Sequence, residues 1–83
     1  MKIKPLRKDL KDCLQKHQLE EKWQKILKYL QDDLSHPSLN LELLRPRWRG
    51  IYSFRIDRKY RAIFFITPKK EIEVFQITNH YKK

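Results

Sequence analysis

The sequence has one glycine, one cysteine and no long apolar segment. With Gly50 as the only glycine, the chain lacks a glycine-rich phosphate loop, which excludes a P-loop or dinucleotide-binding site. A single cysteine allows no intramolecular disulfide, and the position of Cys13 on an apolar helical stripe predicts a buried, unreactive thiol. No apolar run reaches the length of a membrane span or a signal peptide, so we expect a cytosolic protein without membrane contact.

Signatures of metal sites and of covalent catalysis are also missing. His17 and His36 have no neighbouring cluster of acids or thiols that would complete a metal site. No serine lies in the glycine-flanked motif of a nucleophile elbow. We therefore expect neither a metal nor a cofactor.

Positive charge is what the sequence has in excess, with 20 basic residues against 10 acidic ones and a net charge of +10. Residues 41–83 hold 11 basic and 4 acidic residues, whereas residues 1–40 hold 9 and 6. This excess favours a polyanionic partner, first nucleic acid and then an anionic membrane surface or an acidic protein. Arginine suits bidentate contact with phosphate, and the second half contains Arg45, Arg47, Arg49, Arg55, Arg58 and Arg61.

The periodicity of apolar residues predicts helices first and strands afterwards. Apolar residues at helical spacing indicate helices over about 6–17 and 20–33, joined closely enough to form a hairpin. A loop follows at 35–38, and strands are predicted at 41–44, 51–57, 60–67 and 71–78, with a weak edge strand at 1–4. We expect one α+β domain over residues 1–83. In it, two N-terminal helices pack on one face of a small, mainly antiparallel sheet, and the other face is a cationic floor for nucleic acid.

Two residues are candidates for acid–base or electrostatic catalysis. Glu42 is the only acid between Asp33 and Asp57, which suits either a surface ion pair or a general base in a cationic site. Arg61 lies in an apolar strand and is either an outward-facing side chain or a clamp on a phosphate whose charge grows in the transition state. We expect Glu42, Arg61 and the C-terminal His80 to lie at the surface.

Aromatic residues provide two further candidates. The run Arg47-Trp48-Arg49 suits either a cationic stacking surface for RNA or a tryptophan that caps the edge of the core. His80 and Tyr81 follow the last strand, where a terminal pair is usually frayed and inert.

Several motifs in residues 41–81 together resemble the RelE/ParE superfamily of bacterial toxins, and most closely its YoeB-type mRNA endoribonucleases. The motifs are Glu42 eight residues before Gly50, the Tyr-Ser-Phe-Arg-Ile run at 52–56, Tyr60-Arg61 before an apolar strand, and the His80-Tyr81 pair. The order of two helices followed by strands agrees, so the resemblance spans the chain.

The resemblance implies that the chain cleaves ribosome-bound mRNA without a metal, by attack of a ribose 2′-OH on the adjacent phosphate. It implies that Glu42 is the general base, that Arg61 stabilises the phosphate, and that His80, paired with Tyr81, is the general acid. Arg45 would be a second cation beside the phosphate. The remaining arginines expected to contact RNA are Arg47, Arg49, Arg55 and Arg58.

The resemblance also implies partners and leaves two alternatives. The expected partners are a cognate acidic antitoxin, the ribosome and mRNA, with assembly as a homodimer or a toxin–antitoxin heteromer. The ParE branch poisons DNA gyrase without nuclease chemistry, and a catalytically inactive nucleic-acid-binding module is the second alternative. The sequence departs from YoeB-type toxins in having Lys82 and Lys83 after Tyr81, no glycine in the turn before Tyr60, and no family signature in the first helix.

Overall fold

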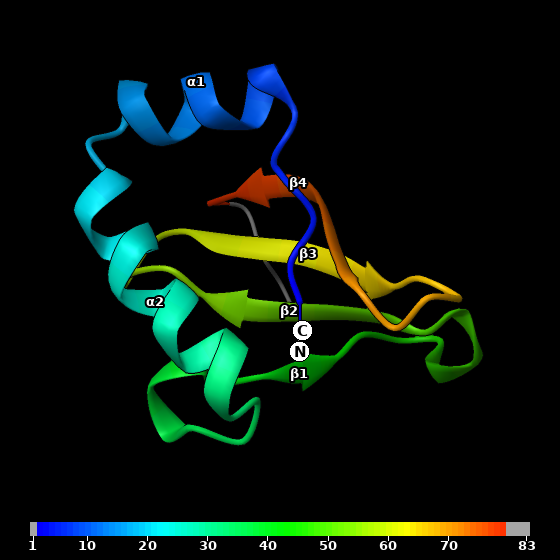
Figure 1. The fold of residues 1–83 in the computed structure, drawn as a ribbon. Helices are drawn as coiled ribbons and strands as arrows, with labels where there is room; N and C mark the ends of the chain where they lie inside the picture. Colours follow the sequence, from blue (N-terminus) through cyan, green and yellow to red (C-terminus); the bar gives the residue numbers. More distant parts are fainter. Residues whose placement is uncertain (1, 80–83) are drawn as a thin grey trace.

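The computed structural model describes residues 2–79. It contains one antiparallel sheet of strand order β1-β2-β3-β4, with α2 across one face (Figure 1). Two N-terminal helices followed by this sheet confirm the predicted α+β fold. The elements are helices α1 Lys8–Lys16 and α2 Glu20–Asp32, 3-10 turns η1 Pro37–Leu39 and η2 Arg47–Arg49, and strands β1 Glu42–Leu43, β2 Ile51–Arg55, β3 Arg61–Ile66 and β4 Ile72–Thr78.

Helix α1 is shorter than the predicted span of 6–17. Its first turn begins after Arg7, whose backbone is extended (φ −63°, ψ 157°) and whose guanidinium donates to the carbonyl oxygen of Phe75 at 2.8 Å. The helix ends because Gln18 adopts a left-handed φ of 56°. The Leu19 N–H then donates to the Leu14 carbonyl at 2.8 Å and leads the chain into α2. Within residues 2–79, no helix is long and apolar enough to span a bilayer.

The N-terminal segment forms less structure than the predicted edge strand. Ile3 makes one parallel bridge with Ile72. Two hydrogen bonds fix it, from Lys4 N–H to Ile72 O at 2.9 Å and from Ile72 N–H to Lys2 O at 2.8 Å. The segment therefore covers part of the β4 edge without extending the sheet by a full strand.

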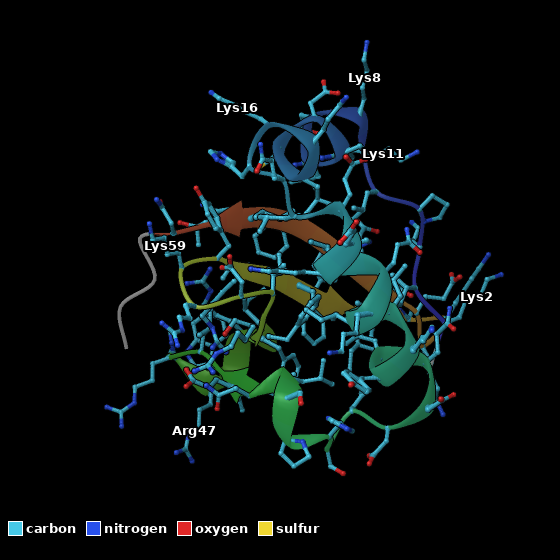
Figure 2. All side chains as sticks on the ribbon, turned by 90° about the vertical axis from the view of Figure 1, so that its left-hand side faces the viewer. Lys2, Lys8, Lys11, Lys16, Arg47 and Lys59 are labelled. Atoms are coloured by element: carbon cyan, nitrogen blue, oxygen red, sulfur yellow. The ribbon has the colours of Figure 1, made fainter. Side chains whose placement is uncertain are left out.

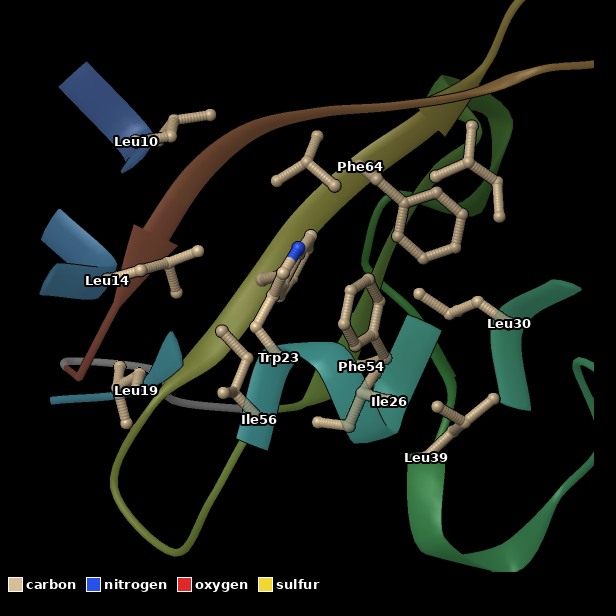
Figure 3. Close-up of a cluster of buried hydrophobic side chains, with 13 residues drawn as sticks. Leu10, Leu14, Leu19, Trp23, Ile26, Leu30, Leu39, Phe54, Ile56 and Phe64 are labelled. Atoms are coloured by element: carbon tan, nitrogen blue, oxygen red, sulfur yellow. The ribbon is translucent and has the colours of Figure 1, made fainter. Parts of the chain in front are cut away.

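The core lies between α2 and the sheet (Figure 3). The Trp23 ring on α2 packs 5.7 Å from Phe54 on β2, and Phe54 packs 5.6 Å from Phe64 on β3. Leu30 and Leu39 lie at the end of the core opposite Leu10 and Leu14 (Figure 3), and both are fully buried. Cys13 was expected in this core, but it is only partly buried because it lies beside the α1 stripe formed by Leu10 and Leu14.

The face of the sheet opposite α2 differs from the predicted cationic floor. Cross-strand register places Arg55 opposite Arg61 at one end of this face. Away from this end the same face carries apolar residues: Ile63 is buried, and the Phe65 and Phe75 rings lie 5.9 Å apart. The opposed arginines of this face therefore lie at the end of the sheet where β2 stops and β3 starts.

Candidate active site

A cleft of about 810 Å³ opens at that end of the sheet. Because the strands are antiparallel, the start of β1, the end of β2, the start of β3 and the end of β4 all meet there. The lining contains four cations and two carboxylates, so the cleft is suited to an anionic ligand. Its lining residues are Asn40, Glu42, Arg55, Asp57, Arg58, Lys59, Arg61 and Asn79.

Arg61 is held at the base of this cleft by polar groups from two other segments. Its Nε donates to Ser53 Oγ at 3.0 Å, and its Nη2 donates to the Asn40 carbonyl at 2.6 Å and more weakly to the Ser53 carbonyl at 3.4 Å. Ser53 is fully buried, and Arg61 is only 8% exposed. The expectation that Arg61 lies at the surface is therefore wrong, because neighbouring backbone and hydroxyl oxygens solvate its charge within the sheet.

Arg55 and Arg61 form a directly opposed pair of like charges across β2 and β3. Such a pair destabilises an isolated sheet, and an anion bound between the two would relieve the repulsion. Arg55 is exposed, whereas the Arg61 guanidinium is turned toward Ser53. The two side chains thus provide one fixed and one adjustable cation in the same cleft.

Glu42 lies on the same face as this arginine pair. It is the register partner of Ser53, and Ser53 in turn accepts the hydrogen bond from Arg61. Glu42 is half-buried and lines the cleft. The fold therefore brings a carboxylate and a fixed guanidinium together from β1 and β3, with Ser53 on the strand between them.

The second carboxylate of the cleft, Asp57, is occupied in closing the β2–β3 turn. Its Oδ1 accepts from the N–H groups of Tyr60 at 2.7 Å and Lys59 at 2.8 Å, while Lys22 Nζ lies 3.4 Å from Oδ2. Partial burial acts to raise the pKa of Asp57, but the Tyr60 and Lys59 N–H groups, together with Lys22, outweigh it and leave the pKa below its ordinary value. Because these contacts engage the Asp57 carboxylate in the turn, Glu42 is the candidate base.

The other residues proposed from the sequence lie in three places. Arg58 lines the cleft with Arg55. Arg45, Arg47 and Arg49 lie on the β1–β2 connection, outside the lining of the cleft. His80 and Tyr81 lie outside the described residues.

The histidines of the described part make aromatic and hydrogen-bonding contacts. The His17 Nδ1 lies 3.0 Å from the Tyr60 hydroxyl, and His36 stacks on Tyr29 with ring centroids 3.8 Å apart. Among residues 2–79, no group of three or more His, Cys, Asp or Glu side chains is placed to hold a metal.

Five residues of the site were not predicted from the sequence: Asn40, Ser53, Asp57, Lys59 and Asn79. Ser53 lies two residues before Arg55 in a predicted strand and therefore shares its face. Its proximity to the cleft could thus have been predicted. Lys59 lies in the turn between Arg55 and Arg61. Its place near these two arginines could also have been predicted from the sequence. Asn40 contributes its carbonyl because it adopts a left-handed φ of 45°, a conformation that asparagine tolerates, but nothing in the sequence indicated which side chain it would meet.

The fold has counterparts among known proteins. The family model of the ParE toxin of the type II toxin–antitoxin system parDE matches residues 4–82. A solved structure, the YoeB/ParE toxin from Agrobacterium tumefaciens, superposes with a TM-score of 0.70 at 20% identity and covers 98% of this chain and 100% of its own. No curated protein matches the chain in sequence.

An α+β domain of two helices and an antiparallel sheet is the architecture shared with that toxin structure. Because the family model covers nearly the whole chain, the chain belongs to the ParE toxin family of type II toxin–antitoxin systems. The resemblance to the RelE/ParE superfamily is thereby confirmed. The likeness to the YoeB/ParE structure concerns the fold alone.

Proposed function

We propose that this toxin is a ribosome-associated endoribonuclease that cleaves mRNA by attack of a ribose 2′-OH on the adjacent phosphate. The observation that carries the proposal is that Glu42 and Arg61 line one cation-rich cleft, on strands separated by a single strand. A base and a fixed phosphate-binding guanidinium are the two groups that this reaction needs at the start.

In the proposed reaction, Glu42 takes the proton of the 2′-OH as the 2′ oxygen forms a bond to phosphorus. Negative charge grows on the non-bridging phosphate oxygens, and the Arg61 guanidinium stabilises it. The bond from phosphorus to the 5′ oxygen breaks, and His80, paired with Tyr81, protonates the leaving oxygen. The products are a 2′,3′-cyclic phosphate and a 5′-OH end.

Further cations would hold the strand on either side of the scissile phosphate. Arg55, Arg58 and Lys59 line the cleft around Arg61. Phosphate contacts of this kind fix the register of the nucleic acid and make binding depend on salt. The burial of Arg61 supports a positioned electrostatic group, because a guanidinium held by three hydrogen bonds needs little reorganisation during the reaction.

Inhibition of DNA gyrase is the second candidate, and the match to the ParE toxin of parDE favours it. A gyrase poison has no need of a carboxylate beside a fixed arginine. The two functions separate in parallel assays of the same preparation, one on ribosomes carrying a defined mRNA and one on gyrase supercoiling of plasmid DNA. We expect mRNA cleavage and unchanged supercoiling; inhibited supercoiling with intact mRNA would overturn the nuclease proposal.

A further inference from the structure

Trp48 is exposed to a degree unlike any other large apolar side chain of the described residues. It is 85% exposed, whereas Leu41, Leu43 and Ile66 are 36–40% exposed. The alternative that Trp48 caps the edge of the core is therefore wrong. A tryptophan offers a large, rigid aromatic face, and leaving it in water forgoes the favourable burial of that area.

The backbone that carries Trp48 is fixed, so its exposure is built into the fold. The η2 turn is closed by hydrogen bonds of 3.1 Å from Arg49 N–H to Pro46 O and from Gly50 N–H to Arg47 O. Gly50 then takes a φ of 66°, which a residue with a side chain rarely adopts. The Leu44 N–H donates to Ile51 O at 2.8 Å and anchors the turn to the sheet.

The neighbours of Trp48 in sequence are cations. Arg47 and Arg49 flank it, Arg45 lies three residues before it in the sequence, and all three are exposed. No acid occurs between Glu42 and Asp57. Ion pairs within residues 2–79 engage Lys2, Lys4, Arg7 and Lys22, which lie elsewhere in the fold.

We infer that Trp48 is a stacking platform for an unpaired RNA base, with Arg47 and Arg49 binding the phosphates on either side. An aromatic face stacks on any base, and flanking cations track the backbone of a single strand. Because tryptophan and arginine are also enriched at protein interfaces, the test below includes an acidic protein partner as a competing outcome. The inference rests on the proposed function in taking RNA as the polyanion.

The platform is a second contact, distant from the bond to be cleaved. Strand β2 separates it from Arg55 in the cleft, a span of about 17 Å for five residues at roughly 3.4 Å each. Figure 2 shows Arg47 and Lys59 on the same side of the sheet, away from α2. A single strand held in the cleft can therefore continue along the β1–β2 edge to Trp48.

The test measures binding of an unstructured 12-nucleotide RNA to the full chain carrying Glu42→Gln, so that the RNA stays intact. Adding Trp48→Ala should weaken binding about 5- to 150-fold, which is the range for loss of one stacked base. Trp48→Phe, which keeps a smaller aromatic face, should lose less. The matched control is Ile66→Ala, which truncates another exposed apolar side chain and should bind as the parent does.

Two further readouts separate stacking from charge. Bound RNA should protect Trp48 from quenching of its fluorescence by acrylamide, while Trp23, 5% exposed, contributes little to the quenched signal. Replacing Arg47 and Arg49 with Gln should lower the salt slope of binding by about 1.4, at roughly 0.7 per phosphate contact of a single strand. Trp48→Ala should leave that slope unchanged.

The outcomes distinguish this site from the nuclease proposal. RNA binding that depends on Trp48, in a protein that does not cleave ribosome-bound mRNA, would support the platform and overturn the nuclease. Cleavage by the wild type, together with parental RNA binding by Trp48→Ala, would overturn the platform and leave the nuclease standing. Loss of affinity for an acidic protein partner, with RNA binding intact, would also overturn it.

Discussion

The buried hydroxyl of Ser53 accepts a hydrogen bond of 3.0 Å from Arg61 Nε and so joins β2 to β3 beneath the cleft. The same guanidinium donates to the Asn40 carbonyl just before β1. Three segments that are distant in sequence thus converge on one cation. The orientation of Arg61 toward the cleft depends on these partners.

Ser53→Ala should destabilise the fold and also slow cleavage. The substitution removes the acceptor of a buried, charged donor, which costs about 1–3 kcal/mol of unfolding free energy. Cleavage should fall less than in Arg61→Ala, because the charge remains while its orientation is lost. Chemical denaturation and single-turnover cleavage measure the two effects, with Ser38→Ala, on the exposed η1 turn, as the control. A destabilised variant that cleaves at the wild-type rate per folded molecule would show that Ser53 is purely structural.

Arg61→Ala should reduce the single-turnover rate by about 10²–10³-fold, as for loss of one donor to a developing oxyanion. Because Arg61 is buried, we also expect a stability loss of about 1–3 kcal/mol, since Ser53 Oγ and the Asn40 carbonyl lose their donor. Arg61→Lys keeps the charge but not the planar fork and should restore only part of the rate. Full activity in Arg61→Lys would argue against a positioned guanidinium.

The Asp57 carboxylate should make the fold sensitive to acid. Its folded-state pKa lies below the ordinary value, so its stabilising effect is complete above about pH 4 and is lost as the pH falls through the folded pKa. Asp57→Asn should cost about 1–2 kcal/mol at pH 7. The difference from the wild type should disappear at strongly acidic pH. Denaturation between pH 2 and 7 measures this, with Asp12→Asn on the exposed side of α1 as the control; a difference that persists at pH 2 would contradict the assignment.

An acidic antitoxin should cover the cleft and restore growth when it is co-expressed with the toxin. Arg55→Gln and Arg58→Gln together should slow its association about tenfold or more at low salt, because the cleft contributes much of the local positive field. The control is Lys8→Gln with Lys11→Gln, which removes equal charge from α1 at the far end of the molecule (Figure 2). Equal effects of the two pairs would place the antitoxin elsewhere.

Local sequence patterns were sufficient for the order of elements and for most of the core. The strand predicted at 51–57 contains β2, in which Phe54 is buried and Arg55 is exposed. Helix ends were less accurate, because the end of α1 depends on the left-handed Gln18 and its start on a contact of Arg7 with β4.

The site could be predicted only in part, because its geometry also depends on contacts between segments that are distant in the sequence. Residue type and position singled out Glu42 and Arg61, which both line the cleft, but the burial of Arg61 arises from tertiary acceptors at Ser53 and Asn40. A charged side chain in an apolar strand is expected to face solvent unless buried hydrogen-bond acceptors of this kind are known. Likewise, the exposure of Trp48 depends on the closed η2 turn, which the sequence indicated only through Pro46 and Gly50.

The most direct test of the central claim is single-turnover cleavage of ribosome-bound mRNA by the wild type and by Glu42→Gln, with chemical analysis of the new ends. We predict 2′,3′-cyclic phosphate and 5′-OH ends from the wild type, and a rate about 10²–10⁴-fold lower for Glu42→Gln, as for loss of a general base. Glu71→Gln, in the β3–β4 turn at the end of the sheet opposite the cleft, is the matched control and should cleave normally. An unchanged rate in Glu42→Gln, or 5′-phosphate ends, would contradict the proposed chemistry.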